Sequence, residues 1–512
     1  MLHSGVCSRA IGAGCDGRIG VDDTVSNLVR SKRKPSSRDL AQPPLVVDLD
    51  GTLIRSDLLY ESFFSALAKS WSGALKAVLA LRSGKAALKR TLGDVCDIDY
   101  ATLPYNQAVL DLIARAKADG RNVVLATAAD AGHAQAIADH LKLFDEVLAS
   151  EGAVNLSAKS KANALVAAYG DGGFDYVGNA APDLKVWKHA RNAYAVDAPG
   201  GVLRRLAAQG KTATVVETPR AGLKVWLKAI RVHQYAKNVL VFVPLLTSHS
   251  FNVPAFIDAG LAFVAFCLCA SSVYLINDLL DLKSDRAHAS KRRRPLASGA
   301  IQIRQAMILA PALLIAAAAI AVAVGPPFVL ALSAYFVLTC AYSFYLKRRL
   351  LVDVVTLSML YAARIFGGAS AIDVEVSQWL LGFSLFLFTS LALMKRYVEL
   401  AARIDRSLAD PSDRNYRLDD LPIVAALAAG TGVSSVLVLS LYVASPEIQA
   451  NYARPQILWL MCPILLYWIG RALMMAHRRD MNDDPIVFAL TDRNSRIALV
   501  CFMAIFAAAS LG

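Results

Sequence analysis

The sequence predicts a Rossmannoid α/β domain with a parallel sheet, followed by an all-α bundle of about nine transmembrane helices. Charged residues make up 19% of the chain, below the roughly 25% of an ordinary soluble domain. Up to about residue 225, short apolar strands alternate with helical stretches. Beyond that point the chain holds one apolar run after another, several of them long enough to cross a bilayer. The chain is therefore expected to combine a soluble part with a membrane part.

Four regions are expected along the chain. Residues 1–43 are rich in Gly, Ser and Arg and lack the apolar core of a secretory signal, which predicts a disordered tail. The α/β domain is expected over 44–198 and a linker over 199–224. The membrane part is expected to fill 225–512.

Within the α/β domain, strands are predicted near 45–47, 122–126 and 174–177. Because helical stretches separate them, they favour a parallel sheet with its chemistry at the carboxyl ends of the strands. A helical insert over about 57–103 follows the first strand. We expect it to form a cap over the site; resting on the membrane surface is the alternative.

Loop charges indicate how the membrane part is oriented. The predicted spans are 238–250, 256–278, 304–324, 327–346, 352–371, 378–395, 422–444, 456–475 and 493–511. Every second loop between them is rich in Lys and Arg, and the others are nearly free of both. The positive-inside rule then predicts a multi-pass protein of the cell inner membrane, with the N-terminal domain in the cytoplasm and the C-terminus outside.

The formal net charge of +13 would favour a nucleic-acid partner in a soluble protein. Here much of the basic charge lies in the short loops between apolar runs. Such charges orient the protein and meet anionic lipid or phosphorylated substrates. Membrane and phosphorylated substrates are therefore the expected partners, and nucleic acid is not.

A row of carboxylates ends the second predicted span. Asp278, Asp281 and Asp285 are three and four residues apart, so on a helix they share one face. Carboxylates that close repel each other unless they hold a cation, and Mg²⁺ prefers such oxygen ligands together with phosphate oxygens. The basic run 291–294 follows directly. Carboxylates for metal and cations for phosphate in one loop predict a diphosphate site.

These residues carry a resemblance. Asn277-Asp278 through Asp285, followed by Lys291-Arg292-x-Arg294-Pro295-Leu296-Ala297-Ser298-Gly299, resembles the first aspartate-rich motif of the UbiA prenyltransferase superfamily. The resemblance covers about 225–512, and segments 231–242, 342–368 and 395–400 are most similar to decaprenyl-phosphate phosphoribosyltransferases. Relatives that use prenyl diphosphates usually carry two or more aspartates in a second motif. Here only Asp353 is present, near Arg364.

The resemblance implies a Mg²⁺-dependent transfer from phosphoribosyl pyrophosphate to a polyprenyl phosphate. Asp278 and Asp281, with Asp285 or Asp353, would hold the metal and the pyrophosphate leaving group. The implied substrate-binding residues are Lys237, Asn277, Lys291, Arg292, Arg294, Tyr342, Lys347 and Arg364. Most of these are cations that would bind phosphates, while Tyr342 would donate a hydrogen bond to one and Asn277 would orient a carboxylate.

A second resemblance lies in the α/β domain. Asp48-Leu49-Asp50-Gly51-Thr52-Leu53 follows an apolar strand and resembles the first motif of the HAD hydrolase superfamily over about 44–198. It implies that Asp48 is the nucleophile and Asp50 the general acid/base. Thr127 and Lys161 fit the binding residues of the next two motifs, and Asp48, Asp50 and Asp183 would be the Mg²⁺ ligands. Asn179 stands where the family usually has an aspartate, which would weaken the metal site.

Three functions are consistent with these patterns. The first is a two-step enzyme, in which the membrane domain makes a polyprenyl-phosphoryl-5-phosphoribose and the HAD-like domain removes its 5-phosphate. The second is an aromatic or quinone prenyltransferase that uses a prenyl diphosphate. The third is a non-enzymatic membrane scaffold with an inactive HAD module.

Overall fold

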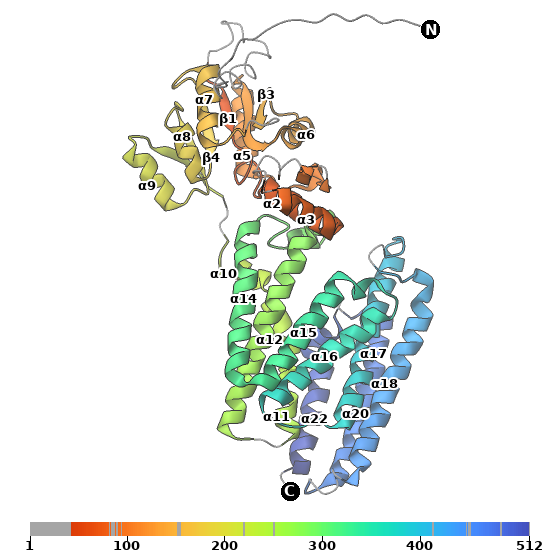
Figure 1. Cartoon of the computed structure of the whole chain (residues 1–512). Helices are drawn as coiled ribbons and strands as arrows, with labels where there is room; N and C mark the ends of the chain where they lie inside the picture. Colours follow the sequence, from red (N-terminus) through yellow and green to blue (C-terminus); the bar gives the residue numbers. More distant parts are fainter. Residues whose placement is uncertain are drawn as a thin grey trace, which may run out of the picture. The chain divides into compact units, whose positions relative to one another are not determined.

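The chain forms two compact units, which are described separately. The computed structural model describes residues 42–510 apart from 81, 83–87, 89, 90, 94, 151–154, 219, 220, 249, 250, 412, 413, 447, 449–451, 482 and 483. The predicted tail over 1–43 lies almost wholly outside the described residues. The first unit comprises the chain up to Val225 together with Leu279–Arg304, and the second comprises Trp226–Asp278 with Gln305–Gly512 (Figure 1).

The first unit is built on a parallel sheet of six strands in the order β3-β2-β1-β4-β5-β6. The strands are β1 (Leu45–Val47), β2 (Val123–Asp130), β3 (Glu146–Ser150), β4 (Asp175–Gly178), β5 (Ala193–Val196) and β6 (Ala213–Val216). The chain runs from β1 to β3 on one side and returns to the other side at β4. The carboxyl ends of β1 and β4 therefore flank the switch point where ligands bind in open α/β sheets.

Alternate side chains of β1 enter the cores on the two faces of the sheet, as the period of a strand requires. Leu45 and Val47 pack with α5 (Gln107–Ala118) and α6 (Ala131–Leu141). Val46 packs on the other face with α7 (Ala158–Tyr169), α8 (Leu184–Trp187) and α9 (Gly200–Ala208). The predicted α/β class is confirmed, and β1 is buried on both faces, as expected of a central parallel strand.

Two segments differ from the predicted domain plan. The predicted linker over 199–224 instead contains α9 and the edge strand β6, which pairs with β5. Its sequence, Ala-Thr-Val-Val, is short, and the two central residues are exposed, so its hydrophobic signal is weak.

The predicted cap contains α2 (Leu58–Lys69), α3 (Trp71–Ala80) and the 3₁₀ turn η2 (Tyr100–Thr102). Residues 279–304, expected in the membrane part, pack with this first unit as α13 (Leu282–Ala287) and η5 (Lys291–Arg293).

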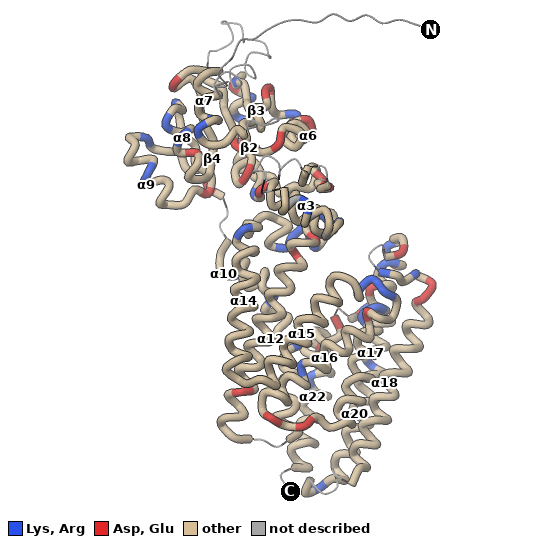
Figure 2. The backbone as a smooth tube through the Cα atoms, in the orientation of Figure 1, with Lys and Arg blue, Asp and Glu red and all other residues tan. Residues whose placement is uncertain are grey.

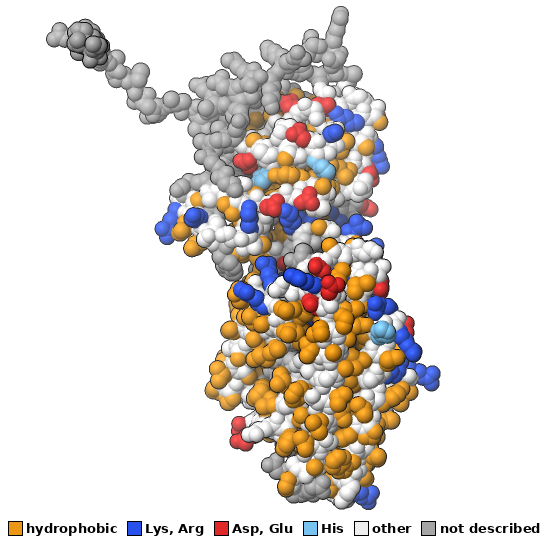
Figure 3. All heavy atoms as spheres, turned by 90° about the vertical axis from the view of Figure 1, so that its right-hand side faces the viewer, with side chains coloured by type: hydrophobic (Ala, Val, Ile, Leu, Met, Phe, Trp, Pro, Cys, Tyr) orange, Lys and Arg blue, Asp and Glu red, His pale blue; other side chains and the backbone are white. Residues whose placement is uncertain are grey.

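The second unit is a helical bundle. Eight of its helical segments among the described residues are long and apolar enough to span a membrane: Val253–Leu280, Ile303–Val324, Pro326–Phe344, Val352–Ala371, Gln378–Asp405, Leu418–Ala444, Pro455–His477 and Arg493–Ser510. In Figure 1 the helices among them are α12, α14 to α18, α20 and α22. Charged residues are sparse along the middle of these helices (Figure 2), and hydrophobic side chains cover much of the surface that they present (Figure 3). A multi-pass membrane protein follows from these helices.

The first of the nine predicted spans has a different structure. Residues 232–242 form the 3₁₀ segment η4 (Val232–Phe242), and the short helix α11 (Val243–Thr247) follows. Neither is long enough to count as a span by itself. Polar side chains of η4 contact other parts of the bundle: Asn238 accepts a hydrogen bond from Arg364, and Lys237 pairs with Asp484. Helix α16 (Val352–Ala371) approaches η4 so closely that a Cβ added at Gly368 would lie 1.9 Å from the carbonyl oxygen of Val241.

Candidate active sites

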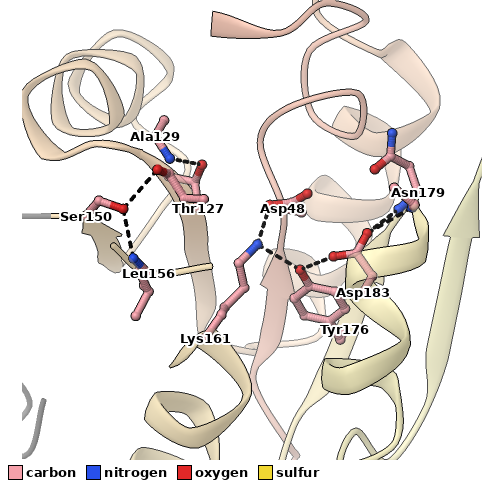
Figure 4. A network of polar contacts seen from close by, with 11 residues as sticks. Asp48, Thr127, Ala129, Ser150, Leu156, Lys161, Tyr176, Asn179 and Asp183 are labelled. Atoms are coloured by element: carbon pink, nitrogen blue, oxygen red, sulfur yellow. Dashed lines mark hydrogen bonds and ion pairs between the residues drawn. The ribbon is translucent and has the colours of Figure 1, made fainter. Parts of the chain in front are cut away.

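The site of the first unit lies at the carboxyl end of β1. Lys161, on α7, donates a hydrogen bond of 2.6 Å to Oδ1 of Asp48 and one of 3.1 Å to the hydroxyl of Tyr176 (Figure 4). The Tyr176 hydroxyl in turn donates to Asp183. Thr127, in the second half of the neighbouring strand β2, is buried and accepts a hydrogen bond from the backbone of Ala129. The structure thus brings Asp48, Lys161 and Asp183 into one network, as the sequence predicts.

Asp183 organises the loop that follows β4. Its Oδ2 accepts hydrogen bonds of 2.9 Å from the backbone amides of Asn179 and Ala180, and its Oδ1 accepts the bond from Tyr176. The side chain of Asn179 lies against Gly51, where an added Cβ would be 2.1 Å from its amide nitrogen. Asn179 therefore reaches the loop that carries Asp48 and Asp50, even though it has no carboxylate to contribute.

Burial raises the pKa of both aspartates, and it raises that of Asp50 more than that of Asp48. Loss of solvation raises the pKa of Asp48 to about 6, against the opposing effect of the Lys161 ammonium. Loss of solvation, reinforced by the nearby charge of Asp57, raises the pKa of Asp50 to about 8. Burial alone would lower the pKa of Lys161, but the carboxylates of Asp48 and Asp183 outweigh it and raise that pKa. At neutral pH, Asp48 is then largely ionised and Asp50 largely protonated, a pairing of carboxyl groups that suits acid–base chemistry.

Some residues at this site supply the oxygen atoms that a hard cation binds. Carboxylate and amide oxygens are the ligands that Mg²⁺ prefers, and Asp48, Asp50 and Asn179 supply both kinds. The raised pKa of Asp50 means that its negative charge is poorly compensated by the protein, so a cation would stabilise the ionised form. Both oxygens of Asp183 already accept hydrogen bonds, which favours a role in orienting the loop.

Asp50→Asn is expected to stabilise the metal-free first unit at neutral pH. A carboxyl whose folded-state pKa is raised releases its proton first in the unfolded chain, so stability is lost as pH rises from about 4 to about 8. Asparagine has no charge to bury and still accepts the hydrogen bond that the amide of Leu58 gives to Oδ1. We expect a gain on the order of 3 kcal/mol at pH 7, from the pKa difference.

Calorimetry of the full-length protein in EDTA at pH 5 and pH 8 measures this effect. The exposed Asp139 on α6 provides the control variant, Asp139→Asn, which should leave the pH slope unchanged. Equal slopes for Asp50→Asn and the wild type would contradict the assignment of the buried charge to Asp50.

In the second unit, the end of α12 (Val253–Leu280) carries the predicted acidic motif. Asp278 is 3% exposed and forms an ion pair with Arg231, whose guanidinium also lies over the ring of Tyr274. Asn277 donates a hydrogen bond of 2.9 Å to the hydroxyl of Ser343, on α15 (Pro326–Phe344). Arg231 adopts a left-handed backbone conformation with φ of 54° where α10 (Leu223–Ala229) gives way to η4. An arginine thus compensates the charge of the buried carboxylate.

The continuation of the motif belongs to the first unit. Asp285, on α13, is 1% exposed and accepts a hydrogen bond of 2.6 Å from Nη1 of Arg294. Lys291 and Arg294 are half-buried, and Arg292 is exposed. Asp281 is half-buried at the start of α13. The loop therefore presents several cations next to a carboxylate that one of them already holds.

Further ion pairs lie inside the second unit. Nε of Arg396 is 2.8 Å from Oδ2 of Asp353, and both side chains are almost fully buried. Nζ of Lys237 is 2.5 Å from Oδ2 of Asp484, and Lys395 is 3.9 Å from the same oxygen. These pairs join residues that are far apart along the chain.

The other predicted binding residues of the second unit differ in their environment, which is polar for some and apolar for others. The guanidinium of Arg364 contacts Asn238 and the hydroxyl of Tyr335, and it lies over the Tyr335 ring. Tyr342 is half-buried against an apolar cluster, and Lys347 is half-buried in the turn η6 (Leu346–Arg348). Their roles in binding remain predictions.

No group of three or more His, Cys, Asp or Glu side chains close enough to hold a metal ion occurs in the part of the chain that the structure describes. Asp278, Asp285 and Asp353 each pair with an arginine. Their carboxylates have the chemistry of Mg²⁺ ligands, but a cation would have to share them with those arginines. The predicted metal roles of all the aspartates remain predictions.

A large apolar cavity lies inside the second unit. Its volume is about 560 Å³, and it is bounded by η4, α17 (Gln378–Asp405), α18 (Leu421–Ala444), α20 (Met461–His477) and α22 (Arg493–Ser510). Leu240, Phe383 and Phe502 are typical lining residues, and Lys237 contributes a charged side chain to the wall. Such a cavity suits an apolar chain that carries a negatively charged head.

Sequence reasoning missed two residues of these sites. The sequence indicates Arg231, the partner of Asp278, only as part of a matching segment, and it assigns no role to Asp484, the partner of Lys237. The available signal for Asp484 is its place in the acidic pair directly before Pro485, because charged groups near transmembrane helices usually pair or function.

Together the two units define a multi-pass membrane protein that also carries an α/β domain built on a six-stranded parallel sheet. The model of the UbiA prenyltransferase family matches residues 239–495, and the chain belongs to that family. It is 36% identical over 455 residues to the uncharacterized protein y4nM of Sinorhizobium fredii, a match that covers 88% of each chain. It is 34% identical to the nodulation protein NoeC of Azorhizobium caulinodans over 54% of this chain and 90% of that one.

A decaprenyl-phosphate phosphoribosyltransferase of Mycolicibacterium smegmatis is 36% identical over 193 residues, which are 36% of this chain and 61% of the enzyme. Among solved structures, a UbiA homolog from Archaeoglobus fulgidus bound to GPP and Mg²⁺ is similar over 56% of this chain and 100% of that one, with 16% identity and a TM-score of 0.43. A HAD family hydrolase from Salmonella enterica is similar over 36% of this chain and 75% of that one, with 16% identity and a TM-score of 0.25.

Proposed function

We propose that the protein transfers a phosphoribosyl group from phosphoribosyl pyrophosphate to a polyprenyl phosphate in the membrane. We further propose that its HAD-like domain then removes the 5-phosphate. The observation that carries the first step is the 36% identity to decaprenyl-phosphate phosphoribosyltransferase within a UbiA-family chain. That relative's name specifies both the lipid acceptor and the transferred group.

The surroundings of Asp353 support this choice over a prenyl-diphosphate donor. Relatives that use prenyl diphosphates resemble one another in a second motif with several aspartates. Here Asp353 has a buried arginine, Arg396, as its partner. One carboxylate with an arginine partner offers fewer oxygen ligands for a second metal–diphosphate site than a motif with several aspartates.

In the transfer, an oxygen of the lipid phosphate attacks the anomeric carbon of the donor. The bond between that carbon and the pyrophosphate oxygen breaks, and pyrophosphate leaves with the bonding electrons. Bound Mg²⁺ would neutralise the charge that develops on this leaving group. Asp278 and Asp281 would hold it, with Asp285 or Asp353 as a further ligand. Lys291, Arg292 and Arg294 would bind phosphate oxygens, as arginines do in a bidentate manner.

Lys237 would bind the phosphate of the acceptor, since it lies in the wall of the apolar cavity that would take the prenyl chain. The ion pair with Asp484 keeps this lysine in position, and Lys395 adds a second cation near the same carboxylate. Asn277 and Tyr342 would orient polar groups, and Lys347 and Arg364 would add positive charge. By the positive-inside rule the loops that carry Lys291, Arg292, Arg294 and Lys347 face the cytoplasm of the inner membrane, where a phosphorylated sugar donor is soluble.

The HAD-like domain would act on the phosphomonoester of the product. Ionised Asp48 attacks the phosphorus while Asp50 donates its proton to the departing sugar hydroxyl, and water later releases the phosphate from the aspartyl intermediate. Lys161 holds Asp48 in place and offsets the added negative charge. The pKa values of Asp48, about 6, and Asp50, about 8, suit these two roles near neutral pH.

Mass spectrometry of the lipid made by purified protein tests the whole proposal. Membranes or detergent micelles would contain polyprenyl phosphate, phosphoribosyl pyrophosphate and Mg²⁺. We expect a pentosyl-phosphoryl lipid that lacks the 5-phosphate. Turnover of a prenyl diphosphate onto an aromatic acceptor would instead assign the protein to the quinone prenyltransferases. Failure to form product from either donor would favour the scaffold.

A further inference from the structure

We propose that the cap of the HAD-like domain holds the basic loop of the transferase site in place through a buried ion pair between Glu61 and Arg286. Glu61 lies on α2 of the cap, and Arg286 lies on α13, at the start of the loop. Both residues belong to the first unit. The inference rests on the proposed function, because that function assigns Lys291, Arg292 and Arg294 of this loop to donor binding.

The contact between the two side chains is bidentate. Nη1 of Arg286 donates to Oε2 of Glu61 at 3.0 Å, and Nη2 donates to Oε1 at 2.6 Å. Nε of the same guanidinium donates to the carbonyl oxygen of Ala297 at 3.0 Å. One arginine therefore joins the cap to the beginning and to the end of the loop, using the fixed fork that lysine lacks.

Burial makes this contact costly to break. Glu61 is 5% exposed and Arg286 is 8% exposed, and Glu61 also accepts a hydrogen bond from the hydroxyl of Ser56. Removing one charge of a buried pair leaves the other without compensation, which destabilises far more than the loss of an exposed pair. Such an exposed pair exists beside it, between Lys283 and Asp97, and it offers an internal comparison.

A close backbone contact supports the same attachment independently. Gly299, at the end of the loop, has a φ of +68°, and an added Cβ would lie 2.7 Å from Cβ of Arg55 and 3.0 Å from its carbonyl oxygen. Arg55 follows the Asp48–Leu53 motif, and its amide donates to the carbonyl of Pro104 at the far end of the cap. The loop thus packs directly on the HAD-like domain at a second point.

The consequence for the transferase follows from chain connectivity. Asp285 precedes Arg286 and accepts a hydrogen bond from Arg294, so fixing Arg286 also limits where Asp285 and Arg294 can lie. Precise placement of groups that bind a leaving group contributes strongly to catalysis. Glu61 is therefore a positioning residue for the transferase, although it lies in the α/β domain and contacts no substrate in this proposal.

The test uses full-length protein with Glu61→Gln, and with Gly299→Ala as a second, independent perturbation. Asp139→Asn, on the exposed face of α6, and Asp97→Asn, in the exposed ion pair, are the matched controls. Transferase kinetics with phosphoribosyl pyrophosphate would give KM and kcat. Limited trypsin digestion would report cleavage after Lys291, Arg292 or Arg293, which requires the loop to leave its position and does not depend on any activity.

We expect Glu61→Gln and Gly299→Ala to raise the KM for the donor about tenfold, with a smaller change in kcat, and to accelerate cleavage within the loop. Both controls should behave like the wild type. Unchanged cleavage in both variants would overturn the attachment itself, whatever the activity. Faster cleavage with unchanged donor KM would overturn the positioning role. A wild-type protein that makes no pentosyl lipid would reject the proposed function, while the digestion would still decide whether the loop is attached.

Discussion

Asp278→Ala should reduce formation of the pentosyl-phosphoryl lipid by at least about 100-fold, the scale seen when a group that stabilises developing charge is removed. Asp278 is buried at the end of α12 with Arg231 as its partner. Without the carboxylate, the metal that neutralises the pyrophosphate loses a ligand, and Arg231 is left to bind the anion directly. We therefore expect the loss in kcat as well as in the apparent affinity for Mg²⁺.

Asp258→Ala is the matched control, since it removes the same side chain from the same helix. The two positions are twenty residues apart, or about 30 Å along an α-helix. Asp278→Asn, which keeps the shape of the side chain, separates loss of charge from loss of folding. Labelled lipid formed at the wild-type rate by Asp278→Ala would remove this residue from the transferase site.

Asp48→Asn should leave the transfer intact and stop the second step. The expected product is the lipid that still carries its 5-phosphate, because the amide cannot attack phosphorus. The loss of phosphate release should be at least about 100-fold. In the wild type this release should be fastest between pH 6 and pH 8, where Asp48 is ionised and Asp50 is protonated.

Mass spectrometry separates the two lipid products, and time courses of inorganic phosphate measure the release itself. Asp139→Asn again serves as the control from the same domain. If wild-type protein and Asp48→Asn give the same phosphorylated lipid, the HAD-like domain does not act on this product. In that case Asn179, in place of an aspartate, is the first residue to examine by Asn179→Asp.

The sequence placed several residues of the α/β candidate site directly after strands, and the structure brings Asp48, Lys161 and Asp183 together there. Asp48 comes after β1, and Asp183 lies in the loop after β4, so parallel pairing of neighbouring strands was enough to bring them together. The edge strand β6 was missed because a short strand with exposed side chains has almost no hydrophobic signal. The first predicted span was wrong because hydropathy records composition and not hydrogen-bond pattern, and η4 is a 3₁₀ segment.

The membrane site was predictable only as a set of residue types. Spacing along one helix pointed to Asp278, but nothing local indicates that Arg231, 47 residues away, is its partner. The pair between Lys237 and Asp484 spans 247 residues. Such pairs follow from how helices pack, and packing depends on small residues such as Gly368 that carry no charge signal of their own.

The interrupted course of the chain through its first unit has a consequence for biosynthesis. The segment 279–304 is made only after η4, α11 and most of α12, yet it completes the α/β unit. During translation, Glu61 has no Arg286 to pair with until the ribosome has passed residue 286. A fragment that ends at residue 225 would lack this ion-pair partner permanently. The α/β unit of this protein is therefore completed only after the first membrane helix has been synthesised.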